Sequence, residues 1–388
     1  MAALSVGSSK RIIFWQSTPS SHQAAYIRAL AEPPLMRTVK LFLSYEHDKQ
    51  RSAMGLHDPD YGHVPVAFKP DEAEVAKNLL SSDGNTVQLF SEFIADSSIR
   101  GILQRTCLGP GMVGLISEGR DWRGYKGSLR RLHGYTCERR FAQRVDFILA
   151  IGQLATEWYA RCGFPRDKIF DFCYVAEKTV TSERPIRPQN DPMRLLFVGQ
   201  LIRRKRLDLL LQALSTLASS SWVLRVIGDG PEFQSLYHFS RQHGLSDRVQ
   251  LLGGLDNSLV RHELANSDIL VLPSDWDGWG AVVNEALMSG TRVVCSNFCG
   301  AADLIKGKGC GDVFQAGSTA SLAASLEGQF AQGPVGSVER QAIIRYGETF
   351  NGPTVARYLN EIIEFVAGGK IGVRPVPPWA LPSLIARP

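Results

Sequence analysis

Short apolar runs of strand length alternate with amphipathic stretches of helix length from residue 194 onward. An apolar run at 195–198 precedes a helical pattern over 206–217, and a second strand-like run at 222–227 ends in the turn sequence Gly-Asp-Gly-Pro. Near-continuous apolar strands separated by helices are typical of a parallel sheet with helices on both faces. The same pattern predicts strands at 249–252, 269–272, 292–295 and 312–314, and helices at 258–265, 281–289, 301–305 and 319–329.

The first half of the chain repeats this alternation less regularly. A strand is predicted at 11–15, and Ser20, Ser21 and His22 form the start of a helix over 23–31. Residues 177–192 contain three prolines among polar side chains, which is typical of a linker. The remaining predicted strands of this half lie at 39–43, 86–89, 111–116, 145–151 and 169–175.

The length of 388 residues is enough for two domains of ordinary size. We therefore predict an α/β protein with two Rossmann-like, doubly wound domains. The first covers 1–180 and the second covers 193–340, with a linker at 181–192. A helical pattern over 341–367 follows the second sheet, and a proline-rich tail occupies 368–388.

Composition and charge narrow the class of protein. Hydrophobic residues make up 44% of the chain and charged residues 21%, values that favour packed cores and argue against a disordered protein. The seven cysteines and the absence of an apolar leader in residues 1–10 favour a reducing, cytoplasmic compartment and structural thiols. No run reaches the roughly 20 apolar residues of a membrane-spanning helix. The net charge of +5 alone does not identify a binding partner.

In open parallel sheets ligands bind at the carboxyl ends of the strands, so the loops that follow strands are candidate sites. After the strand at 195–198, four cations follow one another as Arg203, Arg204, Lys205 and Arg206, at the start of a helix. A solvated charge run is the alternative interpretation. Because the helix N-terminus carries positive dipole charge, four cations there indicate a bound anion such as phosphate.

A glycine-rich turn follows the strand at 269–272. Gly278 and Gly280 leave backbone N–H groups open at the start of the next helix, and two carboxylates, Asp277 and Glu285, flank them. Such a turn can hold a phosphate while the acids bind hydroxyl groups on either side. The alternative is that Asp277 is a capping residue and Glu285 an exposed helix acid.

These motifs occur in one order: Phe197-Val198-Gly199-Gln200-Leu201 with Lys205 and Asp208; Ile227-Gly228-Asp229-Gly230-Pro231-Glu232; and Leu272-Pro273-Ser274 followed by Asp277-Gly278-Trp279-Gly280, Glu285-Ala286, Gly290 and Gly300. In order, spacing and strand-loop context, residues 194–329 resemble the donor-binding domain of the family-4 retaining glycosyltransferases (glycosyltransferase group 1). The resemblance implies the GT-B fold, with two Rossmann-like domains facing across a cleft. The first half resembles the family only in its rhythm and size.

The resemblance also implies roles for individual residues. Lys205 matches the lysine that contacts the donor diphosphate, and Glu285 matches the acid that grips the nucleotide ribose. Asp277 stands, one side-chain carbon shorter, where the family usually has the glutamate that contacts the donor sugar. Gln200 replaces a common arginine, a loss that Arg203, Arg204 or Arg206 would offset, with Arg204 favoured. Backbone N–H groups of Gly278, Trp279, Gly280 and Ala281 would line the sugar and phosphate pocket, and backbone around Gly253, Gly254 and Leu255 would hold the base.

Asp275-Trp276-Asp277 reads as D-x-D, the metal motif of a different glycosyltransferase fold. Here it lies within a glycine-rich strand-to-helix turn, where cationic side chains and the helix dipole can carry the charge of the leaving group. We therefore predict a metal-independent enzyme with no cofactor besides the nucleotide diphosphate sugar.

In the first half, Glu118 follows a predicted strand and could orient the acceptor hydroxyl or assist its deprotonation; its alternative role is a helix cap. His22 and Arg120 are candidate contacts to acceptor or phosphate. Residues 120–144 hold eight basic side chains, two acids and interleaved aromatics, for a net charge of +6. That composition suits an anionic membrane surface, and an ordinary helix with a solvated basic side is the alternative.

The combined expectation is a retaining glycosyltransferase that moves a hexose-type sugar from a nucleotide diphosphate sugar to a hydroxyl of a glycan or lipid-linked glycan, in bacterial-type polysaccharide or lipopolysaccharide synthesis. The resemblance implies that the 341–367 helix crosses back to the acceptor-binding N-terminal domain. No nucleic-acid partner is expected, and the predicted location is cytoplasmic, with peripheral membrane contact through 120–144. The alternatives are a nucleotide-sugar epimerase, a glycan phosphorylase and a non-catalytic nucleotide-sugar-binding partner subunit. No G-x-G-x-x-G follows the first strand of either half, which argues against a dinucleotide-dependent oxidoreductase.

Overall fold

The computed structural model describes residues 11–46, 59–80, 84–91, 97–176, 191–217 and 220–380. The chain divides into two compact units. Within the described ranges, the first unit holds the residues up to Val175 together with Asn351–Pro378, and the second holds Ala176–Phe350 with Trp379 and Ala380. Most of the predicted linker, 181–190, and the end of the predicted tail, 381–388, lie outside the described residues.

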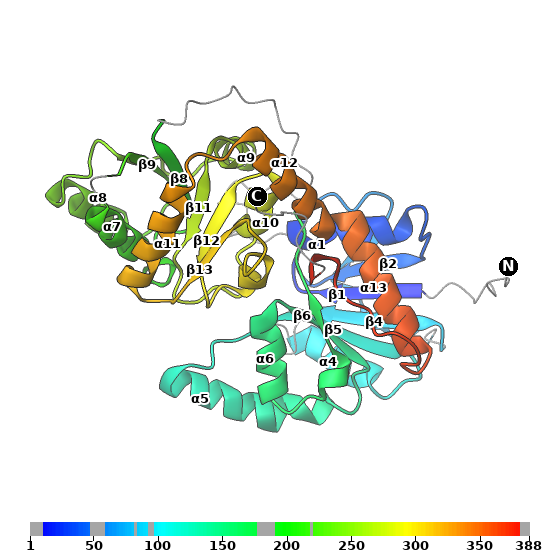
Figure 1. Ribbon diagram of the computed structural model, residues 1–388. Coiled ribbons are helices and arrows are strands. Elements are labelled where there is room, and N and C mark those ends of the chain that lie inside the picture. The colour runs from blue at the N-terminus through cyan, green and yellow to red at the C-terminus, as the bar shows by residue number, and fades with distance from the viewer. Residues whose placement is uncertain are drawn as a thin grey trace. The chain divides into compact units, whose positions relative to one another are not determined.

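The first unit is built on a parallel sheet with the order β3-β2-β1-β4-β5-β6-β7 (Figure 1). The chain order reverses between β1 and β4, as it does in doubly wound sheets. The central strands are almost fully buried, which explains their continuous apolar sequences. The strands are β1 (Arg11–Gln16), β2 (Val39–Leu43), β3 (Val66–Phe68), β4 (Thr86–Ser91), β5 (Met112–Glu118), β6 (Phe147–Ile151) and β7 (Ile169–Phe172).

Helices complete the first unit. The helix α5 (Gly124–His133) continues into a π turn, Gly134–Glu138, and a 3-10 turn, Arg139–Phe141. The helix α13 (Gly352–Ala367) packs against α1 (Ser21–Ala31). The others are α3 (Glu72–Leu80), α4 (Ser97–Thr106) and α6 (Gln153–Arg161).

The single helix expected over 341–367 is wrong, because the structure has two helices there. The first, α12 (Ser337–Gly347), belongs to the second unit, and α13 belongs to the first. Asn351 caps α13 by accepting a hydrogen bond from the Thr354 N–H at 2.9 Å, and a proline in the first turn suits a helix start. Gly352 lies so close to α1 that a Cβ there would approach the Ala25 carbonyl oxygen to 2.7 Å. A new helix therefore starts at this contact.

The second unit has a parallel sheet with the order β10-β9-β8-β11-β12-β13. Its switch point lies between β8 and β11. The strands are β8 (Met193–Val198), β9 (Trp222–Ile227), β10 (Val249–Leu251), β11 (Ile269–Leu272), β12 (Arg292–Ser296) and β13 (Gly311–Phe314), and the helices besides α12 are α7 (Leu207–Thr216), α8 (Phe233–Gln242), α9 (Asn257–Asn266), α10 (Val282–Met288) and α11 (Thr319–Ala331). The segment predicted as a helix at 301–305 is a 3-10 turn, Gly300–Leu304.

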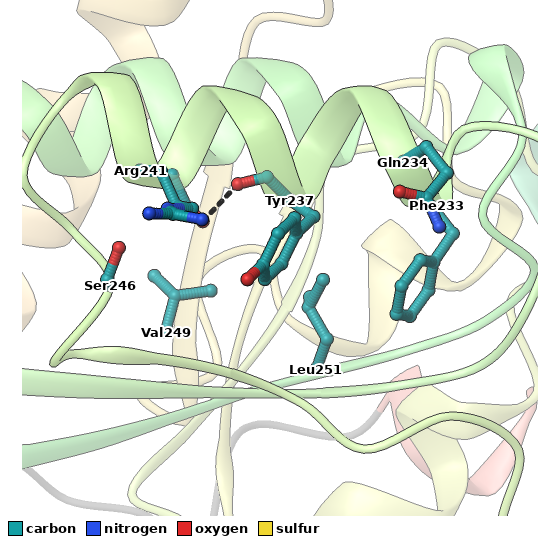
Figure 2. A pocket seen from close by; sticks show the side chains of 8 residues that line it. Phe233, Gln234, Tyr237, Arg241, Ser246, Val249 and Leu251 are labelled. Carbon is teal, nitrogen blue, oxygen red and sulfur yellow. Dashed lines mark hydrogen bonds between the residues drawn. The ribbon is translucent and has the colours of Figure 1, made fainter.

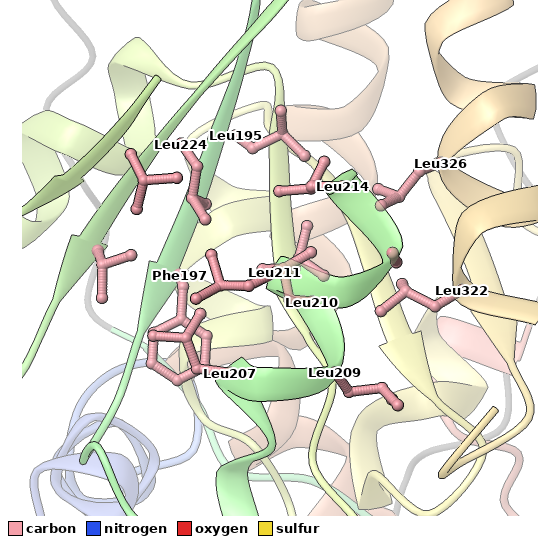
Figure 3. Packing of buried hydrophobic residues seen from close by; sticks show 14 of the residues in the cluster. Leu195, Phe197, Leu207, Leu209, Leu210, Leu211, Leu214, Leu224, Leu322 and Leu326 are labelled. Atoms are coloured by element: carbon pink, nitrogen blue, oxygen red, sulfur yellow. The ribbon is translucent and has the colours of Figure 1, made fainter. Parts of the chain in front are cut away.

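A leucine-rich core holds α7 against the second sheet. Leu207, Leu210, Leu211 and Leu214 project from one side of α7 toward strand residues such as Phe197 (Figure 3). On the other side of α7, Leu322 and Leu326 of α11 close the core. Each fully buried leucine contributes roughly 1.5–3 kcal/mol of transfer free energy. This packing fixes the start of α7, and with it the basic loop that precedes the helix.

Candidate active site

The carboxyl ends of β8 and β11 lie side by side in the second sheet, and their loops carry the predicted site. Lys205 belongs to a 3-10 turn, Arg203–Lys205, that follows β8, and Asp277 follows β11. The Lys205 Nζ lies 2.5 Å from the Asp277 Oδ2, and the two side chains are only 15% and 12% exposed. The structure therefore joins the two residues expected to contact diphosphate and sugar in one ion pair, across 72 residues of sequence.

The loop after β8 is held in place by the loop after β9. The Gly199 N–H donates to the Ile227 carbonyl at 3.0 Å, and the Leu201 N–H donates to the Asp229 carbonyl at 2.8 Å. Gly228, with a φ of +137°, lies where a Cβ would come within 1.9 Å of the Gly199 carbonyl oxygen. Only glycine fits this contact, so the Gly-Asp-Gly turn positions the basic loop.

Arg204 and Arg206, the two cations on either side of Lys205, contact residues other than Asp277. Arg206 has the left-handed φ of +52° and donates to both Asp208 and Asp275, with its Nη1 2.9 Å from the Asp275 Oδ1. Hydrogen bonding to Asp208, the larger cause, and attraction to both acids raise the pKa of Arg206. Arg204 is exposed and donates to the Trp276 carbonyl at 2.7 Å. Arg204 and Arg206 thus hold Trp276 and Asp275 in place.

The glycine-rich turn after β11 is fixed by the segment that follows β12. The Asp277 N–H donates to the Phe298 carbonyl at 2.9 Å, and the Gly300 N–H donates to the Asp277 carbonyl at 3.0 Å. Trp279 is buried and donates through Nε1 to the Asn284 Oδ1 at 2.8 Å, which directs its ring into the protein. Within the described ranges, the backbone N–H groups of Gly280 and Ala281 donate to no protein acceptor. They are available to an anionic ligand.

The fold itself requires a glycine at position 280. Its φ is +88°, and a Cβ there would lie 2.8 Å from the Cys299 Sγ and equally near Leu272. A side chain at this position would therefore strain the backbone and push the turn away from Leu272 at the end of β11 and from Cys299.

Glu285 lies in the first turn of α10 and is partly exposed. Desolvation by the surrounding protein raises the pKa of its carboxyl to about 7, and the charge of Arg261 acts weakly in the opposite direction. A carboxyl with this pKa is part protonated at neutral pH, a property common at functional sites.

The residues expected to hold the base lie after β10, beside β9. The Gly253 carbonyl accepts a hydrogen bond from the Gly228 N–H at 2.8 Å, and Gly254 donates to the Asp229 Oδ2 at 2.7 Å. Leu255 is partly exposed, and Gln200 is exposed. The sequence analysis assigned no role to Asp229, which organises these loops. Its position between two glycines in a turn after a strand was the signal that could have identified it.

The structure also shows organising residues that sequence reasoning missed beneath Asp277. Ser274 is fully buried, and its hydroxyl donates to the Asp277 Oδ2 at 3.4 Å. The Ser296 hydroxyl donates in turn to the Ser274 carbonyl at 2.6 Å. Serines carry no distinctive spacing, so only the fold could bring these two together.

A separate cavity in the second unit lies between α8 and the edge strand β10. Its volume is about 460 Å³, and Phe233, Tyr237, Arg241 and Leu251 are among the residues that line it (Figure 2). None of the predicted donor-binding residues takes part in it. We therefore assign the candidate site to the switch-point loops and not to this cavity.

The site residues expected in the first half all lie in the first unit. Glu118 is the last residue of β5 and not a loop residue. Arg120 donates to the buried Glu138 at 2.6 Å and lies over the Trp158 ring. The His22 ring lies 5.8 Å from the Tyr174 ring, and the His22 carbonyl accepts from the Val175 N–H at 3.0 Å.

Neither a metal-binding cluster nor a membrane-spanning helix occurs in the described part of the chain. It holds no group of three or more His, Cys, Asp or Glu side chains arranged to bind a metal ion. Each acid of the D-x-D sequence faces a cation, Asp275 facing Arg206 and Asp277 facing Lys205. No helix there combines the length and apolar character needed to cross a membrane.

The fold of the whole described chain is that of the GT-B glycosyltransferases. The lipopolysaccharide outer core galactosyltransferase WaaB, in its apo form, matches with a TM-score of 0.69 at 17% identity, over 93% of this chain and 100% of that one. The Anabaena protein Alr3699/HepE, in complex with UDP, matches with a TM-score of 0.67 at 14% identity, over 91% and 99% of the two chains. The prediction of an α/β, GT-B fold is confirmed.

Residues 180–348, which make up most of the second unit, match the model of the family "Glycosyl transferases group 1". The chain is 25% identical over 244 residues to the putative colanic acid biosynthesis glycosyltransferase WcaL of Escherichia coli (strain K12), over 60% of each chain. It is 30% identical over 138 residues to the uncharacterized glycosyltransferase MJ1607 of Methanocaldococcus jannaschii, over 35% of each. The alignments thus span three fifths or less of these relatives' length.

Proposed function

We propose that the protein is a retaining glycosyltransferase that moves a hexose-type sugar from a nucleotide diphosphate sugar to a hydroxyl of a glycan or lipid-linked glycan. The observation that carries the proposal is the Lys205–Asp277 ion pair at the switch point of the second sheet, beside the open N–H groups of Gly280 and Ala281. Cations and backbone donors at one place suit a diphosphate leaving group.

The ion pair suggests how the site works. A bound diphosphate competes with Asp277 for the Lys205 ammonium, because both are anions that the same cation can contact. Once the lysine turns to the phosphates, the Asp277 carboxylate is released to accept hydrogen bonds from hydroxyls of the donor sugar. The Lys205 charge then stabilises the negative charge that develops on the phosphate as the glycosidic bond breaks.

The ribose and base complete the proposed donor site. The ionised Glu285 carboxyl accepts hydrogen bonds from the ribose hydroxyls, and the backbone of Gly253 to Leu255 faces the base. The solved neighbour in complex with UDP supports a nucleotide donor for this fold. The resemblance to family 4 supports retention of the anomeric configuration.

The names of the relatives support a place in polysaccharide synthesis. One is a putative colanic acid biosynthesis glycosyltransferase, and one solved neighbour is a lipopolysaccharide outer core galactosyltransferase. We propose that this protein acts on a comparable glycan acceptor. In the first unit, Glu118, His22 and Arg120 are the proposed acceptor contacts, with Arg120 held in place by Glu138.

We also propose contact with an anionic membrane surface through α5 and the turns after it. Tyr125, Leu129 and Leu132 are spaced four and three residues apart, so they share one face of α5. Their side chains are 76%, 50% and 61% exposed. A cavity of about 730 Å³ follows them, lined by Arg139, Arg140 and Lys168 among others. Exposed apolar side chains among cations suit an interfacial helix. Preference for anionic over neutral liposomes in a flotation assay would support the contact, and equal recovery with both would exclude it.

A non-catalytic, nucleotide-binding subunit is the second candidate function. It is favoured by Gln200 and Asp277, which replace an arginine and a glutamate of the family pattern. A glycosyltransferase would transfer sugar as the purified chain, whereas a non-catalytic subunit would not.

The test is a panel of nucleotide diphosphate sugars, read first by thermal shift, because a ligand stabilises the folded state by mass action. The stabilising donor is then incubated with the protein and glycan acceptors, and the anomeric configuration of the product is read by NMR. Transfer with retention supports the proposal, whereas stabilisation by a nucleotide without turnover supports the subunit role. Inversion at the anomeric carbon would contradict the retaining assignment.

A further inference from the structure

A cavity of about 270 Å³ opens at the carboxyl ends of β1, β2 and β3 in the first unit. Its floor is apolar and includes Trp15, Phe42 and Ile102, and its rim includes Tyr45 and Lys69. The carboxyl edge is where parallel sheets bind ligands, and the volume is near the lower end of small-molecule sites. None of the residues discussed above as donor or acceptor contacts lines this cavity.

The floor of the cavity is rigid. The Trp15 and Phe42 rings stack with centroids 4.3 Å apart, and the Trp15 Nε1 donates to the Gln88 Oε1 at 2.6 Å. The loop after β2 is tied to the end of β1, because the Ser44 and Tyr45 N–H groups donate to the Gln16 and Ser17 carbonyls at 3.0 and 2.9 Å. A rigid floor loses little conformational entropy when a ligand binds.

The rim of the cavity carries the charge of Lys69, which faces no counterion among the described residues. Within the part of the chain that the structure describes, Lys69 is the one charged side chain that lines the cavity, and its ammonium has neither an ion pair nor a hydrogen-bond partner there. Its backbone has the left-handed φ of +44°, while its N–H still donates to the Leu43 carbonyl at 2.8 Å. Strained backbone of this kind in a residue other than glycine occurs preferentially at binding sites.

A second polar group on the cavity lining is also unsatisfied. Gln16 is 2% exposed and donates through Nε2 to the Gln23 Oε1 at 2.8 Å, but no described residue donates a hydrogen bond to its own Oε1. Buried oxygens without a donor are rare in folded proteins. A hydroxyl group at the floor of the cavity would supply the missing hydrogen bond.

We propose that this cavity binds the acceptor and selects one that carries an anionic group, a phosphate or a carboxylate, on a sugar unit. Lys69 pairs with the anion, the ring of the sugar packs on the apolar floor beside the half-exposed Tyr45, and a sugar hydroxyl donates toward Gln16. This inference rests on the proposed function and adds the chemical class of the acceptor to it.

The experiment measures binding by isothermal titration calorimetry on the full chain, with the donor site first saturated with UDP. The probes are glucose, glucose 6-phosphate, glucuronate and inorganic phosphate. The variants are Lys69→Met, which removes the charge at similar length, and Ser98→Trp, which fills the cavity from its exposed rim on α4. Lys77→Met is the matched control, because Lys77 is an exposed lysine of α3 that does not line the cavity.

We expect one or both of the anionic sugars to bind at least tenfold more tightly than glucose and more tightly than inorganic phosphate. Lys69→Met should remove that preference, Ser98→Trp should abolish sugar binding, and Lys77→Met should change neither. Equal binding of neutral and anionic sugars, no binding at millimolar concentration, or a Lys69→Met variant that binds like wild type overturns the inference. If UDP itself does not bind, the proposed function fails; if UDP binds and the anionic sugars do not, only the acceptor class fails.

Discussion

Removing the charge of Asp277 should tighten the binding of a free nucleotide diphosphate while it slows sugar transfer. In the structure the Asp277 carboxylate is 2.5 Å from the Lys205 ammonium, so a diphosphate must displace it. The substitution Asp277→Asn keeps the shape of the side chain and removes the competing anion. The opposite effects on binding and on transfer distinguish this role from simple damage to the site.

The size of the effect follows from the geometry. At 2.5 Å and an effective dielectric constant of about 20, the Coulomb attraction is roughly 6–7 kcal/mol before desolvation is subtracted. The desolvation of two largely buried groups and the ordering of their side chains offset most of this attraction, which leaves a net value of about 1 kcal/mol. We therefore expect UDP to bind Asp277→Asn about fivefold more tightly than wild type. Transfer should fall by roughly ten- to a hundredfold, the value of a hydrogen bond to a charged group.

The assay is calorimetric titration of UDP into wild type, Asp277→Asn, Lys205→Met and the double variant. The gain in UDP affinity caused by Asp277→Asn should vanish in the double variant, because that gain depends on Lys205, which the double variant lacks. Asp312→Asn is the control for net charge, since Asp312 is exposed on β13 and its Oδ1 accepts a hydrogen bond from the Val313 N–H. Equal or weaker UDP binding by Asp277→Asn would refute the competition between Asp277 and the diphosphate.

Three further results are expected. The folded-state pKa of Glu285, about 7, lies above its ordinary value of 4.5, so the stability it contributes is full below pH 4.5 and is lost as pH rises through 7. The unfolding free energy of wild type relative to Glu285→Gln should therefore fall between pH 5 and 7.5 in urea titrations, and parallel curves would contradict the assignment. Gly228→Ala should weaken UDP binding at least tenfold, because its Cβ would meet the Gly199 carbonyl; wild-type affinity would disprove that constraint. Donor hydrolysis should persist in EDTA, whereas loss of activity restored by Mn²⁺ would overturn metal independence.

The sequence predicted most strands of the second unit because buried parallel strands are continuous apolar runs. The strand at 269–272 has the predicted bounds, and the strand at 222–227 does as well. The edge strand β3 was not predicted, since three partly exposed residues give too little pattern. The break between α12 and α13 was not predicted, because the helical spacing of apolar residues continues from one helix into the other. The helices are separated at the close approach of Gly352 to α1, which is a tertiary contact.

The candidate site was predicted in its residue types but not in its connections. The loops after β8 and β11 could be selected because ligands bind where parallel strands end. The direct pairing of Lys205 with Asp277, 72 residues apart, depends on strand order, which the sequence does not show. The raised pKa of Glu285 depends on desolvation in the folded protein, which the sequence does not show. Whether Glu118, His22 and Arg120 touch an acceptor stays a prediction.

The most direct test of the central claim is the rate at which the purified chain cleaves its preferred nucleotide diphosphate sugar, with and without Lys205. With water as the acceptor, this measurement needs no knowledge of the natural glycan. If Lys205 stabilises the leaving diphosphate, Lys205→Ala should cleave the donor at least a hundredfold more slowly than wild type while the fold is retained. A rate within about threefold of wild type would contradict the proposed site.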